Sequence, residues 1–328
     1  MGVLVTGGAG YIGSHMVLEL LDAGEAVTVI DNLSTGFERG VPERAKLVVG
    51  DVGDAGLLQQ VLAEDKIDVI IHFAGSIVVP ESVRQPLQYY ANNTCRSRTL
   101  IECAVNAGVK HFIFSSTAAV YGVPEESPVY EDAPLKPISP YGSSKMMTEI
   151  MLRDAAAAHD LHYVALRYFN VAGADPQLRS GQSTAQATHL IKIAAQAACG
   201  LRPYLEIFGE DYPTPDGTCI RDYVHVTDLA RAHLAALAYL RDGGGPEVIN
   251  CGYGRGFSVL QVIEAVKQVS GVDFSVRRGP RRAGDPAVLI AGAERVKEVL
   301  GWRPELNNLD TIVTHALNWE QQLKNAPA

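Results

Sequence analysis

The N-terminal stretch forms a pattern that few folds can accommodate. A short apolar run, Gly2 to Thr6, leads into Gly7-Gly8-Ala9-Gly10-Tyr11-Ile12-Gly13, and helical apolar spacing follows from Ser14 to Leu21. A second apolar run, Ala26 to Ile30, ends at Asp31. The glycines allow a sharp turn, close approach of a pyrophosphate and tight packing of the helix on the strand, while the acid stands where ribose hydroxyls are held. We therefore predict a strand, helix and strand that bind a dinucleotide.

Three further apolar runs repeat this alternation of strand and helix. They are Leu47 to Val49, ending at Gly50-Asp51; Val69 to Phe73, ending at Ala74-Gly75; and His111 to Phe114, ending in the hydroxyls of Ser115 to Thr117. Regular alternation predicts an α/β fold with a doubly wound parallel sheet of the Rossmann type. In such a sheet the ligand crevice lies beyond the carboxyl ends of the strands, so these residues should meet at one edge.

The alternation breaks after Asn170, where a second, smaller unit is expected. A helix from Ala185 to Ala198 and a short strand at Glu206 to Phe208 belong to it, whereas a helix from Thr227 to Leu240 and a strand from Glu247 to Asn250 resume the earlier pattern. We predict a dinucleotide-binding domain at about 1–170, to which about 218–250 return. About 171–217 and 251–328 are expected to form mainly a mixed α/β substrate-binding domain.

Tyr141 and Lys145 follow Pro140 with a spacing of four residues. If a helix begins at the proline, both side chains lie on one face, and the ammonium should lower the pKa of the phenol from about 10 towards neutrality. A buried phenolate beside the hydroxyl of Thr117 is a general base for alcohol oxidation. Spacing alone fits a surface pair better; the dinucleotide site at the same sheet edge favours the catalytic interpretation.

The residues after Asp31 favour NAD over NADP. No arginine occurs between Asp31 and Arg39, so a 2′-phosphate would meet a carboxylate without a cationic partner. Asp51 could reach the adenine amino group, or could simply occupy a turn or cap a helix. His72 lies in an apolar strand and is expected to pack in the core.

Composition and charge exclude several classes of protein. The chain has 47% hydrophobic residues, enough for a sizeable core, and a net charge of -9 without a basic tail, which argues against a nucleic-acid partner. Five cysteines without a C-x-x-C pair indicate reduced thiols in a cytoplasmic protein rather than a disulfide or metal framework. We expect no signal peptide, membrane helix or metal.

Motifs along nearly the whole chain resemble the extended short-chain dehydrogenase/reductases, and among them the UDP-sugar 4-epimerases. The motifs are Thr6 to His15, Asp31 to Ser34, Gly50-Asp51, His72 to Gly75, Tyr89-Tyr90 with Asn92-Asn93, Ser115 to Gly122, Tyr141 to Lys145, Arg167 to Asn170, Arg221 to Val226, and Arg281 to Asp285. The resemblance implies NAD as cofactor, a UDP-sugar as substrate and Thr117, Tyr141 and Lys145 as catalytic residues.

The same resemblance implies two sets of binding residues. Expected at the cofactor are Gly7, Gly10, Tyr11, Ile12, Gly13, Asp31, Asn32, Leu33, Ser34, Thr35, Gly36, Asp51, Val52, Phe73, Ala74, Gly75, Asn92, Ser115, Tyr141, Lys145 and Phe169. Expected at the UDP-sugar are Thr117, Tyr141, Asn170, His189, Leu190, Glu206, Ile207, Phe208, Arg221, Arg282, Asp285 and Leu289. His189 fits a polar residue flanking a helix nearly as well, and Arg277 and Arg278 are expected to be surface charges.

The implied reaction is oxidation at C4 of UDP-glucose or UDP-galactose, rotation of the 4-keto sugar and reduction on its opposite face. The related dehydratases carry an acid and a base after the active-site hydroxyl, where this chain has Ala118 and Ala119, so elimination of water is rejected. Other UDP-sugars, such as N-acetylglucosamine, uronic acid or pentose derivatives, stay open as substrates, and so does an NAD-binding sensor or scaffold.

Two positions depart from the family pattern. Ser76-Ile77 replaces the usual Leu-Lys, which removes a cation from the cofactor site, and Leu289 is of intermediate size where the family selects for or against N-acetyl groups. The family often pairs helices of two subunits, so the helices expected near 87–107 and 140–158 could form a homodimer interface.

Overall fold

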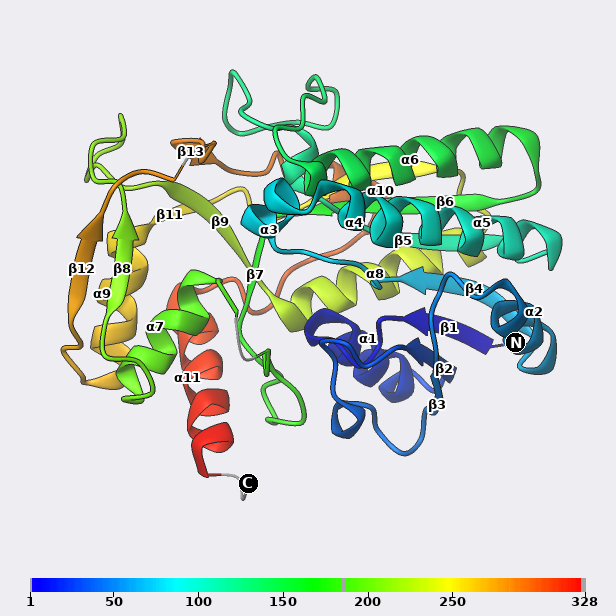
Figure 1. The fold of residues 1–328 in the computed structure, drawn as a ribbon, viewed down its shortest axis with the longest axis horizontal. Coiled ribbons are helices and arrows are strands. Elements are labelled where there is room, and N and C mark those ends of the chain that lie inside the picture. The colour runs from blue at the N-terminus through cyan, green and yellow to red at the C-terminus, as the bar shows by residue number, and fades with distance from the viewer. Residues whose placement is uncertain (1, 185–186, 283, 326–328) are drawn as a thin grey trace.

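The dominant element of this computed structural model is a seven-stranded parallel sheet in the order β10-β6-β5-β4-β1-β2-β3 (Figure 1). The structure describes residues 2–184, 187–282 and 284–325. The strands are β1 (Gly2–Thr6), β2 (Ala26–Asp31), β3 (Lys46–Val49), β4 (Ile67–His72), β5 (His111–Thr117), β6 (His162–Tyr168) and β10 (Glu247–Cys251). This arrangement confirms the predicted α/β fold with a Rossmann-type sheet.

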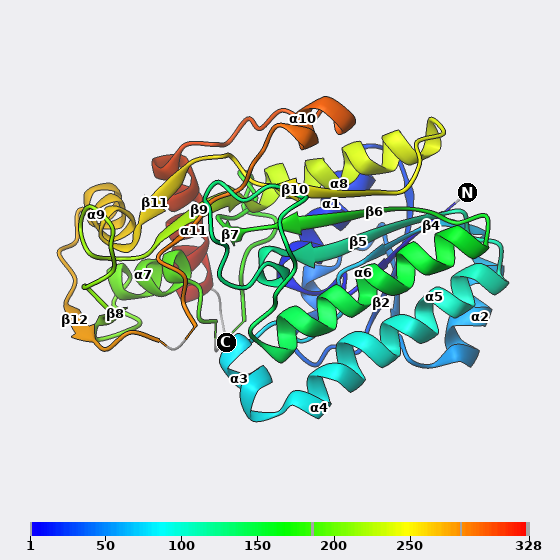
Figure 2. The same ribbon diagram turned by 90° about the horizontal axis from the view of Figure 1, so that it is seen from above.

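Helices cover both faces of this sheet because its strands alternate apolar residues between two cores. Val3 and Val5 pack with α1 (Tyr11–Asp22) and α8 (Val226–Arg241), whereas Leu4 packs on the opposite face with other helices. Figure 2 shows α5 and α6 running side by side on that second face. The helices there are α2 (Ala55–Glu64), α5 (Arg96–Asn106) and α6 (Pro140–Ala158).

Three short helices connect β4 to α5. They are α3 (Val79–Arg84), α4 (Pro86–Tyr89) and a π-helical turn at Tyr90–Cys95. The helix expected near 87–107 is therefore present but interrupted by a wider turn, a feature that often marks functional sites. The turn places Asn92 and Asn93 beside the carboxyl end of β4, where Asn93 Oδ1 accepts a hydrogen bond from the Ser76 amide at 2.7 Å.

A smaller mixed α/β part lies at the left of Figure 1 and has its own apolar core. Its strand β9 pairs with β7, β11 and β13, and β8 pairs with β12. Its elements are β7 (Asn170–Ala172), α7 (Leu190–Ala198), β8 (Leu205–Phe208), β9 (Ile220–His225), β11 (Gly256–Ser258), α9 (Val259–Ser270), β12 (Val276–Gly279), β13 (Val288–Leu289) and α11 (Leu309–Asn325). The short α10 (Arg295–Leu300) packs beside α8 and β10 instead.

The helix predicted from Ala185 to Ala198 is shorter than expected. Its first two residues lie outside the described ranges, and α7 begins only at Leu190 because the backbone of His189 is extended, with φ −72° and ψ 130°. No helix in the described part of the chain is long and apolar enough to cross a membrane. Nor do the described residues form a group of three or more histidine, cysteine or acidic side chains able to hold a metal.

Candidate active site

The carboxyl ends of the sheet strands open into a cavity of about 510 Å³. Most of the predicted cofactor residues line it, as do Thr117, Tyr141 and Asn170 from the catalytic and substrate sets. From the smaller part of the fold the cavity receives His189, Arg221, Asp285 and Leu289. One continuous space therefore joins the glycine-rich turn to residues that stand far later in the chain.

The turn between β1 and α1 has room only for glycine at two positions. Gly7 has φ +72°, and a Cβ added to it would lie 2.6 Å from the backbone nitrogen of Ala74. A Cβ on Gly13 would lie 2.2 Å from the carbonyl oxygen of Gly7. The first amides of α1 have no acceptor within the helix, and Gly10 at its N-cap has no side chain to cap them. This cradle fits the pyrophosphate of NAD.

Asp31 ends β2 with its carboxylate held towards this turn. Its Oδ2 accepts a hydrogen bond from the Ala9 amide at 3.0 Å, and its Oδ1 accepts one from the Leu33 amide at 2.8 Å. Each carboxylate oxygen keeps a further lone pair. Asp31 also lines the cavity, so the carboxylate is placed to accept hydrogen bonds from ribose hydroxyls.

Arg96 joins two predicted cofactor residues, although no sequence motif points to it. Its Nε lies 2.9 Å from Asp51 Oδ1, and its Nη1 donates to Asn92 Oδ1. Asn92 Nδ2 in turn donates to Ser76 Oγ at 2.9 Å, and all four residues line the cavity. Ser76, which replaces part of the family's Leu-Lys, thus bonds into this network, and Arg96 supplies a cation there.

Thr117 and Tyr141 meet at the carboxyl end of β5. Thr117 is the last residue of β5, and Tyr141 lies in the first turn of α6, which begins at Pro140 after Ser139 Oγ accepts a hydrogen bond from the Gly142 amide at 3.2 Å. Both side chains line the cavity, and the hydroxyl of Thr117 is near enough to the phenol to lower the pKa of Tyr141. The helix start predicted at Pro140 is confirmed, and it aims the phenol at the predicted cofactor site.

Lys145 lies one turn further along α6, just behind the cavity wall. Its ammonium donates to the carbonyl oxygen of Ser115 at 2.9 Å and lies 4.9 Å from the ring centroid of Phe114. Gly75 lies beside it, since a Cβ added there would be at an ordinary contact distance of 3.7 Å from this ammonium. Ser115 contributes its carbonyl here, while its hydroxyl pairs with the hydroxyl of Tyr168 instead of lining the cavity.

Burial dominates the acid–base properties of this group. It raises the pKa of Tyr141 above its usual value, against the opposing effect of the hydrogen bond from Thr117. It also lowers the pKa of Lys145 to about 8, partly offset by the charge of Glu149. The expected lowering of the pKa of the phenol by Lys145 is therefore not found: desolvation of the phenolate is the larger effect, and the interaction with Thr117 is the one that opposes it.

The two predicted diphosphate-binding arginines converge on Asp285. Arg221 Nη2 lies 3.7 Å from Asp285 Oδ1, and Arg282 Nε lies 3.0 Å from Asp285 Oδ2. The guanidinium of Arg282 stands 4.8 Å above the ring centroid of Phe208. Only Arg221 and Asp285 of this group line the cavity, so a diphosphate in the cavity would meet Arg221 first.

Some predicted residues do not line the cavity. They are Leu33 and Gly36 on the cofactor side, and Leu190, Glu206, Ile207, Phe208 and Arg282 on the substrate side, in addition to Ser115 and Lys145. β8, which carries Glu206–Phe208, pairs with β12 away from the strand ends, and this explains its distance from the catalytic residues. Among the residues that were not expected in the lining are Arg96, Ser76, Tyr168, Gln182 and Thr188.

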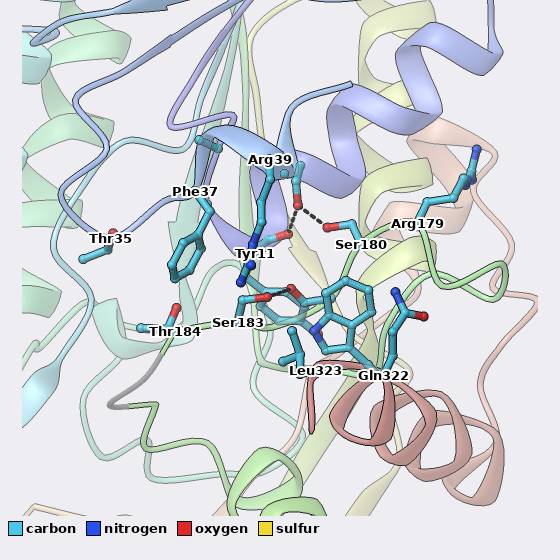
Figure 3. Close-up of a pocket in the computed structure, with 16 residues that line it drawn as sticks. Tyr11, Thr35, Phe37, Arg39, Arg179, Ser180, Ser183, Thr184, Gln322 and Leu323 are labelled. Atoms are coloured by element: carbon cyan, nitrogen blue, oxygen red, sulfur yellow. Dashed lines mark hydrogen bonds between the residues drawn. The ribbon is translucent and has the colours of Figure 1, made fainter. Parts of the chain in front are cut away.

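A smaller cavity of about 260 Å³ adjoins the first at Gly10, Tyr11 and Thr35 (Figure 3). Figure 3 shows Arg39 and Phe37 on one side of it and Arg179, Ser180 and Gln322 on the other. Ser180 Oγ lies 2.6 Å from Ser14 Oγ, which links the loop after β7 to α1. The loop therefore closes over the outer side of the glycine-rich turn.

Known proteins resemble this chain over almost its full length. The model of the NAD dependent epimerase/dehydratase family matches residues 3–252. The chain is 58% identical to the UDP-glucose 4-epimerase of Azospirillum brasilense, over 99% of this chain and 93% of that one. The crystal structure of UDP-glucose 4-epimerase from Brucella ovis in complex with NAD is 44% identical, with a TM-score of 0.94 over 97% of both chains. That of the UDP-Glc/GlcNAc 4-epimerase from Campylobacter jejuni is 49% identical, with a TM-score of 0.86 over 98% of this chain and 99% of that one. The resemblance seen in the motifs is thereby confirmed, and the chain belongs to the NAD-dependent epimerase/dehydratase family.

Proposed function

We propose that this chain interconverts UDP-glucose and UDP-galactose by oxidising and re-reducing C4 of the sugar. The observation that carries the proposal is the placement of Thr117 and Tyr141 in the cavity, with Lys145 directly behind them. Ala118 and Ala119 line the same wall, where a dehydratase would need a further acid and base. The names of the relatives in Azospirillum brasilense and Brucella ovis agree with this reaction.

When bound in the cavity, NAD would supply a reversible hydride acceptor and the positive charge of its nicotinamide. Tyr141 takes the proton of the C4 hydroxyl, and Thr117 donates a hydrogen bond to the same oxygen. Lys145, fixed by the Ser115 carbonyl, adds positive charge beneath the phenol. The 4-keto sugar then turns about its diphosphate link and is reduced on its other face, with Tyr141 returning the proton. No net oxidation results.

This reaction needs a firmly held nucleotide and a loosely held sugar. We propose that 1–170, together with about 218–250, holds NAD through the glycine-rich turn, Asp31 and the Arg96 network. The UDP site comes from about 171–217 and 251–328 together with β9, which belongs to the smaller part of the fold although the sequence placed it in the segment 218–250 that returns to the large sheet. Arg221 of β9 lies nearest the diphosphate. The hydroxyls of the sugar then need few fixed partners, and this leaves it free to turn.

A specific observation supports a wider range of substrates. Leu289 lines the cavity and pairs through β13 with Arg221 of β9, so its side chain lies close to the expected substrate site. The Campylobacter jejuni relative is named for both UDP-Glc and UDP-GlcNAc. An N-acetylated UDP-sugar is therefore the second candidate substrate.

A panel of UDP-sugars tests both candidates. Purified protein incubated without added NAD should interconvert UDP-glucose and UDP-galactose, because the cofactor is regenerated in every turnover. Products are separated by chromatography, and cofactor content is measured after denaturation. If only N-acetylated UDP-sugars were converted, they would be the substrates in place of UDP-glucose and UDP-galactose. If no sugar gave a product, a non-catalytic NAD-binding sensor or scaffold would be favoured.

We propose further that the chain acts as a cytoplasmic homodimer in galactose metabolism. Large apolar side chains are exposed on the helices expected at the interface: Leu87 on α4 is 80% exposed, and Met147 and Ile150 are exposed on α6. Val83, on the preceding helix α3, is also 62% exposed. A patch of this kind on one side of a protein favours a partner surface. Light scattering should give the mass of a dimer, and Leu87→Glu should reduce it, whereas Val272→Glu, at an exposed site elsewhere, should not. A monomeric wild type would contradict the homodimer.

A further inference from the structure

The segment around Gln182 is fixed from three helices. Ser180 bonds to Ser14 of α1, and the ammonium of Lys192 in α7 donates to the backbone carbonyl of Gln182. Lys192 is also paired with Glu320 of α11, and both of these side chains are buried. The backbone at Gln182 therefore has little freedom relative to α7.

The side chain of Gln182 is directed at His189. Gln182 Nε2 lies 2.8 Å from His189 Nδ1, and Gln182 is only 7% exposed. Both residues line the large cavity. His189 directly precedes the first residue of α7, so its backbone is attached to this helix. The imidazole is thus held by one nitrogen while its other nitrogen, Nε2, has no hydrogen-bond partner among the described residues.

An amide NH₂ group can only donate, so the Nδ1 atom that it meets must accept. Burial lowers the pKa of His189, which keeps the ring neutral with a single proton. That proton must then reside on Nε2. The ring therefore offers the cavity an uncharged N–H donor.

We propose that Gln182 is a positioning residue that holds His189 in its Nε2–H tautomer, so that the imidazole donates a hydrogen bond to an oxygen of the UDP group. This inference rests on the proposed function for the identity of the ligand. Phosphate oxygens and uracil carbonyls accept hydrogen bonds and cannot donate them. In the Nδ1–H tautomer the lone pair of His189 Nε2 would face a lone pair of such an oxygen, which is repulsive. Gln182 thereby acts on substrate binding through His189 without touching the reacting carbon.

Three variants separate tautomer control from simple packing. Gln182→Glu keeps the shape but replaces the donor with an acceptor, which should draw the proton to Nδ1. Gln182→Met removes the donor without adding an acceptor. His189→Asn carries an amide that can turn its own N–H to the cavity, so in the double variant with Gln182→Glu the effect of the glutamate should disappear.

The readouts are histidine ¹⁵N chemical shifts, which distinguish the two tautomers, and the dissociation constant of UDP, measured at pH 9 so that the ring stays neutral. We expect the Nε2–H pattern for His189 in the wild type, the Nδ1–H pattern in Gln182→Glu, and a UDP dissociation constant raised about tenfold in that variant. Gln182→Met should give a smaller rise. In activity assays KM should rise more than kcat falls, and NAD content should be unchanged.

An Nδ1–H signal in the wild type, or a Gln182→Glu variant that binds UDP as well as the wild type, overturns the inference. If the glutamate variant does not fold, the wild-type spectrum and the Gln182→Met variant still decide it. A wild type that binds UDP with the Nε2–H pattern but turns over no UDP-sugar would contradict the proposed reaction and leave the role of Gln182 standing.

Discussion

Tyr141→Phe should lower kcat by at least about 100-fold, the typical loss when a general base is removed. The phenylalanine ring keeps the volume of the side chain beside Thr117 but cannot take the C4 proton. Affinity for UDP and the content of NAD should be nearly unchanged, because the ring stays in place and only the interactions of the phenolic hydroxyl, including that with Thr117, are lost. Initial rates, titration calorimetry with UDP and cofactor release after denaturation measure these three quantities.

Tyr130→Phe is the matched control, since it removes a phenolic hydroxyl from an exposed side chain that does not line the cavity. It should keep full activity. If Tyr141→Phe stays within a few-fold of the wild type, the base is another group, and Tyr141 has a binding role only.

Glu149→Ala should destabilise the protein by about 3–5 kcal/mol, because it leaves the Arg167 guanidinium buried without its counter-ion. Arg167 Nη2 lies 2.6 Å from Glu149 Oε2, and its Nε lies 3.0 Å from Oε1. The two side chains are 5% and 6% exposed. The loss is a large fraction of a domain's total stability and should appear as a lower midpoint of urea unfolding.

Two comparisons make this result specific. Glu102→Ala breaks the exposed pair with Arg98 in α5 and should cost no more than about 0.5 kcal/mol. Glu149→Leu combined with Arg167→Met replaces both charges by apolar side chains and should recover much of the loss. Equal effects of Glu149→Ala and Glu102→Ala would show that the buried pair contributes no more than a surface one.

The sheet and the catalytic residues could be predicted because their signals are local. Gly7 has a positive φ and Gly13 packs against the carbonyl of Gly7 within the same turn, and a proline with a preceding serine marks the start of α6. Strand order then follows from the rules for parallel α/β units, which bring Thr117 and Tyr141 to the same edge.

Contacts between distant segments could not be predicted in this way. Nothing near Arg96 in the sequence indicates that Asp51 is its partner, and nothing near Gln182 indicates that its amide meets His189. The alanine-rich sequence predicted too early a start for α7, because the backbone of His189 is extended despite the helical propensity of its neighbours. The pKa of Tyr141 could not be predicted because it depends on burial. The spacing of Tyr141 and Lys145 places both on one face of a helix but does not show how much solvent the phenol loses.

The return of the chain to the large sheet at β10 limits how such a protein can diversify. β10 pairs with β6, and its residues Ile249 and Cys251 are fully buried, yet β7, β8 and β9 intervene between these two strands in the chain. A single recombination event within that interval would pair β6 from one parent protein with β10 from another, and the residues between these two strands are buried. We therefore expect sugar preference among relatives to change by point substitution at cavity positions such as Leu289, rather than by exchange of whole modules.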